Sequence, residues 1–254
     1  MPKGDNVTTN SGGVQSLQRG IAVLRAVAKS NEHGSTLSSI AAELNLNVST
    51  THRMLRLLVA EGLLSFDNNT KLYKLGMDLF LMAGTAQQFT FRDRFRPALE
   101  RIALEAEDMV ALLVRTGYDS ICLDRVEGKY PIRAITIEIG TRRPLGIGAG
   151  SLSLVAFLPE EDLEAVLRAN EPRYPQFRNL TSADIKSIAE TSRSRGYVLS
   201  DGVFHRGIAS VGVPICEDGQ VLAAISVSAI QERMDPDRVG RIVKLIRDSA
   251  EVYL

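Results

Sequence analysis

The spacing of apolar residues between Leu37 and Leu58 limits the possible folds of this chain more than any other feature. A short helical stretch is followed by a three-residue turn, 45–47, and then by a longer helical stretch, which is the spacing of a helix-turn-helix. Thr36 or Ser35 can cap the first helix, and Asn47 can cap the second. The pattern therefore predicts a pair of helices joined by a tight turn.

The polar face of the second helix distinguishes this segment from an ordinary helical hairpin. Its N-terminal half is crowded with hydroxyl and cationic side chains, while aliphatic side chains occupy the opposite face. Recognition helices present their N-terminal residues to base edges in the major groove, and arginine can bond guanine through two hydrogen bonds. A solvated helix face explains the same residues, but we favour DNA binding. The predicted contacts on this helix are Ser49, Thr50, Thr51, His52, Arg53 and Arg56.

A β-hairpin is expected directly after these helices. Strand-like segments at 63–66 and 72–75 flank the turn Asp67–Thr70, whose residues tolerate left-handed conformations. Such a hairpin would form the wing of a winged helix and lie against the DNA backbone. The predicted DNA contacts outside the recognition helix are Arg19, Thr36, Asn69 and Lys71.

The length of the chain, 254 residues, fits two domains. The polar residues 1–13 are expected to form a disordered arm. We expect a DNA-binding domain at 14–75, a linker helix at 76–89 and a second domain at 90–254. Residues 1–75 hold 8 Lys and Arg against 5 Asp and Glu, an excess that favours a polyanionic partner only weakly.

The second domain mixes helices and strands without strict alternation, which predicts an α+β fold with a mixed or antiparallel sheet. Thr181–Asp184 has the pattern of a capping box, and Asp235 with Pro236 has the pattern of a helix start. Glu217–Gln220 predicts a hairpin turn. Helices are expected near 92–107, 151–157, 160–169, 182–194 and 236–252, and strands near 110–116, 120–126, 132–137, 197–199, 208–215 and 221–228.

Several other classes of protein are not favoured. The N-terminus has no apolar segment of a signal peptide, and the longest apolar run, Leu145–Leu158, is too short to span a bilayer. No G-x-S-x-G, HExxH or CxxC motif is present, so we predict neither an enzyme nor a metal or other cofactor. Cys122 and Cys216 lie in apolar stretches and are interpreted as reduced core residues of a cytoplasmic protein. An adaptor that uses the winged helix only as a scaffold stays open as an alternative.

Several ordered motifs resemble the IclR family of bacterial transcription regulators. Ser16–Leu24 resembles the opening of that family, and Ser49–Leu55 followed by Glu61–Leu64 resembles its recognition helix and exit. The likeness extends over about residues 14–252 and includes Arg195–Tyr197, Gly207–Ile215 and Ala223–Ser228. The resemblance implies a winged helix-turn-helix, a linker helix and a GAF-like effector domain, working as a homodimer or tetramer on operator DNA.

A glycine-rich loop, Pro144–Ser151, leads into an apolar helix, and glycines let backbone N–H groups approach a ligand. From the pattern alone, a tight turn is the better explanation of this loop. Ser226 and Ser228 alternate with aliphatic residues on a strand and therefore share one face. The resemblance implies that this loop and these serines hold a small keto or aromatic acid. The implied effector contacts are Leu145, Ile147, Ala149, Gly150, Ser151, Ser200, Ile208, Ser210, Ser226 and Ser228.

The chain departs from the family at two of these positions. Family members often have an acidic residue where Ser200 stands, and some have Cys where Ser210 stands, which leaves the identity of the ligand open. A carboxylate is the favoured headgroup because donors are plentiful here and acceptors few. We therefore expect a sequence-specific transcriptional regulator whose DNA affinity is controlled by a small organic acid. Further candidate contacts, each better explained as a surface residue, are Arg115, Arg133, Arg142 and His205.

Overall fold

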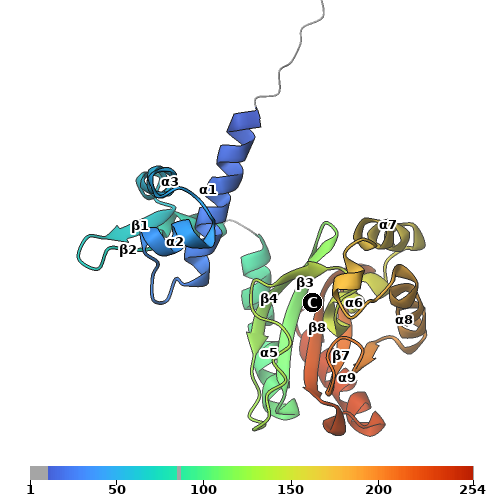
Figure 1. Ribbon diagram of the computed structural model, residues 1–254. Helices are drawn as coiled ribbons and strands as arrows, with labels where there is room; N and C mark the ends of the chain where they lie inside the picture. Colours follow the sequence, from blue (N-terminus) through green and yellow to red (C-terminus); the bar gives the residue numbers. More distant parts are fainter. Residues whose placement is uncertain (1–10, 85–86, 254) are drawn as a thin grey trace, which may run out of the picture. The chain divides into compact units, whose positions relative to one another are not determined.

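The computed structural model describes residues 11–84 and 87–253 (Figure 1). The contacts within the chain divide it into two compact units, 1–89 and 90–254, each with its own hydrophobic core. None of the helices in the described part of the chain is long and apolar enough to cross a membrane.

The first unit is a helix-turn-helix followed by a hairpin, as predicted. Its core forms around Leu55 and Val23, both fully buried, with further aliphatic side chains from each helix and from the first strand. Tyr73 belongs to this core, and its backbone pairs with that of Ser35, which ties the hairpin to the turn before the second helix. The elements are α1 (Ser11–Lys29), α2 (Leu37–Glu43), α3 (Val48–Ala60), β1 (Leu64–Asp67), β2 (Leu72–Leu75) and α4 (Met77–Gly84).

The predicted caps fix where α2 and α3 begin. Thr36 caps α2, since its hydroxyl oxygen accepts a hydrogen bond from the backbone N–H of Ser39 at 3.2 Å. The side-chain oxygen of Asn47 accepts from the N–H of Ser49 at 2.9 Å at the start of α3. Each cap satisfies a donor that the first helical turn leaves free. Both predicted caps are confirmed.

One local expectation for this unit is wrong. Helix α1 begins at Ser11, so residues 11–13 of the expected arm are helical, because an existing helix gains a hydrogen bond with each added residue. Residues 1–10 lie outside the described residues. In the hairpin, Lys71 takes the left-handed conformation, with φ of 59°, because the carboxylate of Asp67 already organises the turn by accepting from the N–H of Asn69 at 2.8 Å.

The second unit is built on an antiparallel sheet with the strand order β5-β4-β3-β8-β7-β6. Its strands are β3 (Met109–Thr116), β4 (Asp119–Val126), β5 (Arg142–Pro144), β6 (Val198–Asp201), β7 (Ile208–Glu217) and β8 (Gln220–Ile230). Its helices are α5 (Gln87–Ala106), α6 (Ala149–Ala156), α7 (Glu160–Asn170), η1 (Tyr174–Gln176), α8 (Ser182–Arg195), η2 (Gln231–Arg233) and α9 (Pro236–Glu251). The predicted α+β class is confirmed, and the sheet is antiparallel throughout.

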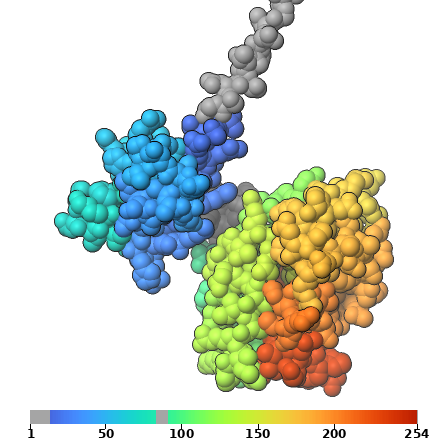
Figure 2. Space-filling model, in the orientation of Figure 1, coloured from blue at the N-terminus to red at the C-terminus, as the bar shows by residue number. Residues whose placement is uncertain are grey.

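Helices cover both faces of this sheet. Val110 and Leu112 of β3 pack with α5 and α9 on one face, while Ala111 and Leu113 pack with α6, α7 and α8 on the other, as alternation along a strand requires. The atoms of α7 and α8 form a continuous outer layer of the second unit (Figure 2). Helix α6 lies directly on β7, because a Cβ at Gly212 would come 2.4 Å from the carbonyl oxygen of Ala149.

Three expectations for the second unit need correction. Residues 132–137 form no strand; guanidinium groups of Arg125 and Arg143 bond the carbonyl oxygens of Ile137 and Thr136 in place of a neighbouring strand. The short strand β5 was not predicted and pairs with β4. The predicted linker helix at 76–89 corresponds to α4 and the start of α5, with residues 85–86 outside the described part.

The two cysteines differ in their surroundings. Both are free thiols, and Cys122 is fully buried in the core beside α6. Cys216 is exposed, so its assignment to the core is wrong. Its strand, β7, continues to the hairpin turn with β8, and Cys216 stands next to the last strand residue, Glu217.

Candidate DNA-binding face and effector cavity

The outer face of α3 carries most of the predicted DNA contacts. The side-chain oxygen of Asn47 accepts from both the N–H and the hydroxyl of Ser49 at 2.9 Å, so the cap also orients that hydroxyl. Arg53 and Arg56 form no ion pair with any residue that the structure describes, which leaves both guanidinium groups open to phosphate or base edges. The exposed residues here are Ser49, His52, Arg53 and Arg56, and Thr50 is half-buried.

Thr51 is the exception, and its assignment to the DNA-binding face is wrong. Its side chain is fully buried, and its hydroxyl donates to the carbonyl oxygen of Asn47 at 3.1 Å. Position 51 lies one helical turn before Leu55, so it shares the face of α3 that packs into the core. A threonine hydroxyl can occupy such a position because the preceding turn satisfies its hydrogen bond.

The other predicted DNA contacts lie on separate elements. Asn69 and Lys71 are exposed at the hairpin, where the ammonium of Lys71 lies 6.0 Å from the ring centroid of Phe66. Arg19 is half-buried on α1. Thr36 is exposed, but its hydroxyl is engaged with Ser39 in the cap of α2.

A cavity that opens to solvent lies on the α6 face of the sheet in the second unit. It brings together residues that are distant in the sequence, with Thr136 before β5 and Phe204 between β6 and β7. None of its lining side chains is acidic. The lining residues are Leu113, Thr136, Ile137, Arg143, Ile147, Gly148, Ala149, Gly150, Ser151, Ser200, Phe204, His205, Ile208, Ser210, Ser226 and Ser228.

Three hydroxyl groups meet at one side of this cavity, and we call them the hydroxyl cluster: Ser210, Ser228 and Thr136. Ser210 and Ser228 are cross-strand partners of β7 and β8, and their hydroxyl oxygens are 2.8 Å apart. The hydroxyl oxygen of Thr136 lies 3.3 Å from that of Ser228. Hydroxyls both donate and accept, so the cluster can bond a polar ligand atom by reorienting its hydrogens.

The N-terminal end of α6 forms another wall. Gly148 offers no side chain to cap this helix, and Ala149 to Ser151 line the cavity. A Cβ at Gly150 would come 2.5 Å from Leu113 Cδ1 and 3.0 Å from the hydroxyl oxygen of Ser226, so only glycine keeps this wall open. The hydroxyl of Ser151 is already engaged, since it accepts from the N–H of Gly146 at 3.1 Å and lies 3.4 Å from the carbonyl oxygen of Pro144.

One predicted effector contact, Leu145, does not line the cavity. Its side chain is fully buried in the core, and its carbonyl oxygen accepts from the hydroxyl of Tyr174 at 2.9 Å. Leu145 directly follows β5, and the turn through Gly146 sends its side chain into the core while Ile147 reaches the cavity. All the other predicted effector residues line the cavity.

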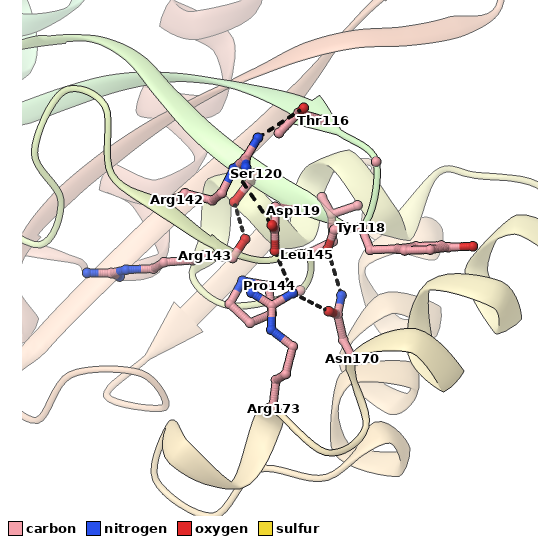
Figure 3. Close-up of polar contacts among 12 residues, drawn as sticks. Thr116, Tyr118, Asp119, Ser120, Arg142, Arg143, Pro144, Leu145, Asn170 and Arg173 are labelled. Atoms are coloured by element: carbon pink, nitrogen blue, oxygen red, sulfur yellow. Dashed lines mark hydrogen bonds and ion pairs between the residues drawn. The ribbon is translucent and has the colours of Figure 1, made fainter. Parts of the chain in front are cut away.

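Sequence reasoning missed several lining residues, of which Arg143 is the most informative. Its side chain is half-buried and donates to the carbonyl oxygen of Thr136 at 2.7 Å. Burial lowers the pKa of Arg143 from its ordinary value. The side chains of Arg142 and Arg143 leave β5 in different directions, Arg142 toward Asp119 and Thr116 (Figure 3). Alternation along a strand was a usable signal, but a three-residue strand is too short to recognise.

His205 also lines the cavity, so its interpretation as a surface residue is wrong. Burial, followed by the charges of Arg143 and Arg178, lowers the pKa of His205. Arg115, Arg133 and Arg142 are exposed, as expected. The remaining lining residues that the sequence did not indicate are Leu113, Thr136, Ile137, Gly148 and Phe204.

Family models agree with both units. One described as "Bacterial transcriptional regulator IclR C-terminal" matches residues 83–252, and one described as "IclR helix-turn-helix domain" matches residues 16–68. The chain belongs to the IclR family. Like its relatives, this IclR-family protein is a DNA-binding transcriptional regulator and not an enzyme.

The similarity to known proteins extends over most of this IclR-family chain. The HTH-type transcriptional regulator KipR of Bacillus subtilis (strain 168) is 30% identical over 219 residues, covering 85% of this chain and 86% of KipR. The Thermotoga maritima IclR crystal structure has 25% identity and a TM-score of 0.74, covering 94% of this chain and 97% of that one. An IclR homologue from Microbacterium hydrocarbonoxydans, crystallised with 4-hydroxybenzoate, has 23% identity and a TM-score of 0.78, covering 94% and 98%.

Proposed function

We propose that a small organic acid binds in the cavity of the second unit and changes the affinity of the protein for its operator. The observation that carries this proposal is the combination of apolar walls with hydroxyl donors and no acidic side chain in the cavity. Small-ligand sites combine apolar surfaces with few, well-placed polar groups in this way. Among homologues, the Microbacterium protein was crystallised with an aromatic acid, which supports the same ligand class here.

Each part of the cavity has a role in this proposal. Ile147, Ile208 and Phe204 supply apolar contacts for the body of the ligand. Ser226 is a buried residue that lines the cavity, and its hydroxyl has no hydrogen-bond partner among the described residues, so it can donate to the ligand. The hydroxyl cluster can bond a further oxygen. We include Ala149, Gly150, Ser151 and Ser200 as further ligand contacts.

We propose that the face of α3 binds operator DNA through Ser49, Thr50, His52, Arg53 and Arg56, with Arg19, Thr36, Asn69 and Lys71 on the phosphate backbone. Solvent exposure and the absence of ion pairs at Arg53 and Arg56 among the described residues support this assignment. Arginine on the N-terminal half of a recognition helix suits contact with guanine.

We also propose that the protein acts as a homo-oligomer on a roughly palindromic operator. Apolar side chains of α4 are exposed, with Met77 at 70% and Phe80 at 72% of their surface. Exposed apolar surface of this kind marks an interaction site. A two-fold dimer doubles the contacts that one winged helix can make. A monomer in light scattering at micromolar concentration, with and without operator DNA, would contradict this assignment.

The effector proposal is tested by calorimetry of the intact protein against keto, hydroxy and aromatic acids, paired with operator titrations at fixed salt. Regulation requires that the ligand shift operator affinity, with a coupling of about 1–3 kcal/mol. Ser226→Ala should weaken ligand binding and leave the operator affinity of the ligand-free protein unchanged. Ser249→Ala is the matched control, because this buried hydroxyl of α9 is also unpaired but lies outside the cavity. Equal ligand affinity in both variants would place the site elsewhere.

A further inference from the structure

Arg143 is the one arginine among the residues that line the cavity, and its charge has no counter-charge. It forms no ion pair with any described residue, and within the described part of the chain its guanidinium donates only to the neutral carbonyl oxygen of Thr136, at 2.7 Å. Other poorly exposed arginines of this unit are paired: Arg125 lies 2.8 Å from Glu138, and Arg238 lies 2.6 Å from Asp108. The unpaired charge is therefore particular to the cavity.

A guanidinium removed from water is stabilised by an anion. Partial burial of a cation costs free energy unless an opposite charge or several hydrogen bonds compensate for it. Arginine has five N–H donors in a planar fork that matches a carboxylate. Since the cavity offers Arg143 only the carbonyl of Thr136, donors remain for a ligand.

Thr136 connects Arg143 to the hydroxyl cluster. Its carbonyl oxygen accepts from Arg143 at 2.7 Å, while its hydroxyl oxygen lies 3.3 Å from that of Ser228. Thr136 is therefore the single residue that separates the guanidinium of Arg143 from the hydroxyl of Ser228 on the cavity wall. A ligand anion at Arg143 would have neutral donors and acceptors beside it for a second oxygen.

We infer that Arg143 is a specificity-determining residue of the cavity: its guanidinium binds the effector's carboxylate, and the hydroxyl cluster bonds a further oxygen of the ligand. The inference rests on the proposed effector site and names Arg143 as the group that selects the anionic ligand over uncharged analogues. Uncharged amides and esters of the same size leave the charge of Arg143 uncompensated, so the site rejects them. Buried charged groups that lose their partner discriminate strongly between ligands of equal shape.

The preceding residue supplies a matched control. Arg142 pairs with Ile121 of β4 and Arg143 with Ser120, so the two arginines occupy consecutive positions of one strand. The guanidinium of Arg142 lies 3.7 Å from the carboxylate of Asp119 and bonds the hydroxyl of Thr116 at 3.3 Å (Figure 3). Arg142 does not line the cavity. Arg142→Gln and Arg143→Gln therefore remove the same charge at adjacent sites, only one of which lines the cavity.

The test is calorimetry of the full-length protein with two acids, 4-hydroxybenzoate and pyruvate, and with their amides, 4-hydroxybenzamide and pyruvamide. The wild type and Arg142→Gln should bind at least one acid and neither amide. Arg143→Gln should lower the affinity for the acid about 100-fold, the usual effect of losing a charge-assisted hydrogen-bond pair. Arg143→Lys should retain part of the affinity, because it keeps the charge without the fork.

Each outcome decides between the inference and the proposal beneath it. Equal acid binding by the wild type and Arg143→Gln would overturn the role of Arg143 and leave the effector site standing. Binding of the amide as tightly as the acid would also overturn it. If neither these acids nor the wider acid panel bind the wild type, the proposed function fails and the inference fails with it. Should Arg143→Gln not fold, as judged by circular dichroism, acid selectivity in Arg143→Lys decides.

Discussion

The outer face of α3 and the effector cavity assemble their polar groups in different ways. The face of α3 comes from neighbouring residues of one helix, and its arginines bond no described partner. The cavity draws on segments from Leu113 to Ser228, and several of its polar groups bond one another before any ligand arrives. A substitution on α3 should therefore act locally, whereas one in the cavity should disturb neighbours as well as the ligand.

Gly150→Val tests this comparison with the largest expected effect. Even a Cβ at this position would come 2.5 Å from Leu113 Cδ1, so the branched side chain must fill the cavity or displace its wall. We expect effector binding to disappear in calorimetry, with a loss of stability of about 1–3 kcal/mol from overpacking. Gly240→Val is the control, because an added Cβ on α9 meets no atom within 4 Å. An unchanged ligand response in Gly150→Val would place the effector site elsewhere.

Arg53→Ala is the corresponding test of α3. Loss of an arginine that reads a base should cost about 1–3 kcal/mol of operator binding. Because the guanidinium of Arg53 bonds no described residue, the melting temperature should stay near that of the wild type. Lys29→Ala is the control, since this exposed lysine of α1 is paired with Glu43 at 2.6 Å. Unchanged operator affinity at fixed salt for Arg53→Ala and Thr50→Ala would remove α3 from the interface.

Thr50 and Thr51 sharpen the comparison within one helix. Thr51→Ala removes a buried hydroxyl and methyl and should lower the free energy of unfolding by about 1–2 kcal/mol. Operator affinity of the folded variant should be retained. Thr50→Ala should instead lower operator affinity, with a free energy of unfolding within about 0.5 kcal/mol of wild type. Urea unfolding and operator titration of both variants check this, and equal stability of the two would contradict the inward orientation of Thr51.

The same difference between the two regions explains what the sequence could predict. On α3 the helical period assigns faces, and the caps Thr36 and Asn47 mark where helices begin. Thr51 is polar, but it lies one turn before Leu55, and so the helical period places it on the buried face. At this position the helical period, and not the polarity of the residue, decides which way the side chain faces.

In the cavity, the limits of sequence reasoning come from sheet register. Ser226 and Ser228 could be placed on one face, because β8 is long enough for alternation to be visible. Arg143 could not be separated from Arg142, because which of them faces inward depends on how β5 pairs with β4, and β5 is only three residues long. Thr136 lies in a segment without strand pairing, so no period locates it.

The smallest expected effect is the pH dependence of effector binding through His205. This histidine lines the cavity, and burial, Arg143 and Arg178 together hold its pKa below the ordinary value of 6.5. A carboxylate bound beside it favours the imidazolium, so the pKa of His205 rises on binding and a proton is taken up. Effector affinity should therefore increase as the pH falls. At about pH 5.5 we expect binding roughly threefold to tenfold tighter than at about pH 7.5, since one proton changes affinity at most tenfold per pH unit.

In the ligand-free protein, the same pKa shift gives stability the opposite pH dependence to that of effector affinity. Because the folded protein holds the pKa of His205 below its unfolded value, the unfolded chain binds more protons near that value, and this contribution to stability is lost as the pH falls below 6.5. The ligand's own carboxyl, with a pKa of about 4, stays ionised over this range. His205→Gln should flatten the pH dependence of calorimetric affinity, whereas His52→Gln, on the exposed face of α3, should leave it as in the wild type. A flat wild-type profile would mean that the anion binds away from His205. An unchanged slope in His205→Gln would assign the proton to another group. Either result would show that His205 is not coupled to the ligand, just as the side chains on the outer face of α3 are not coupled to one another.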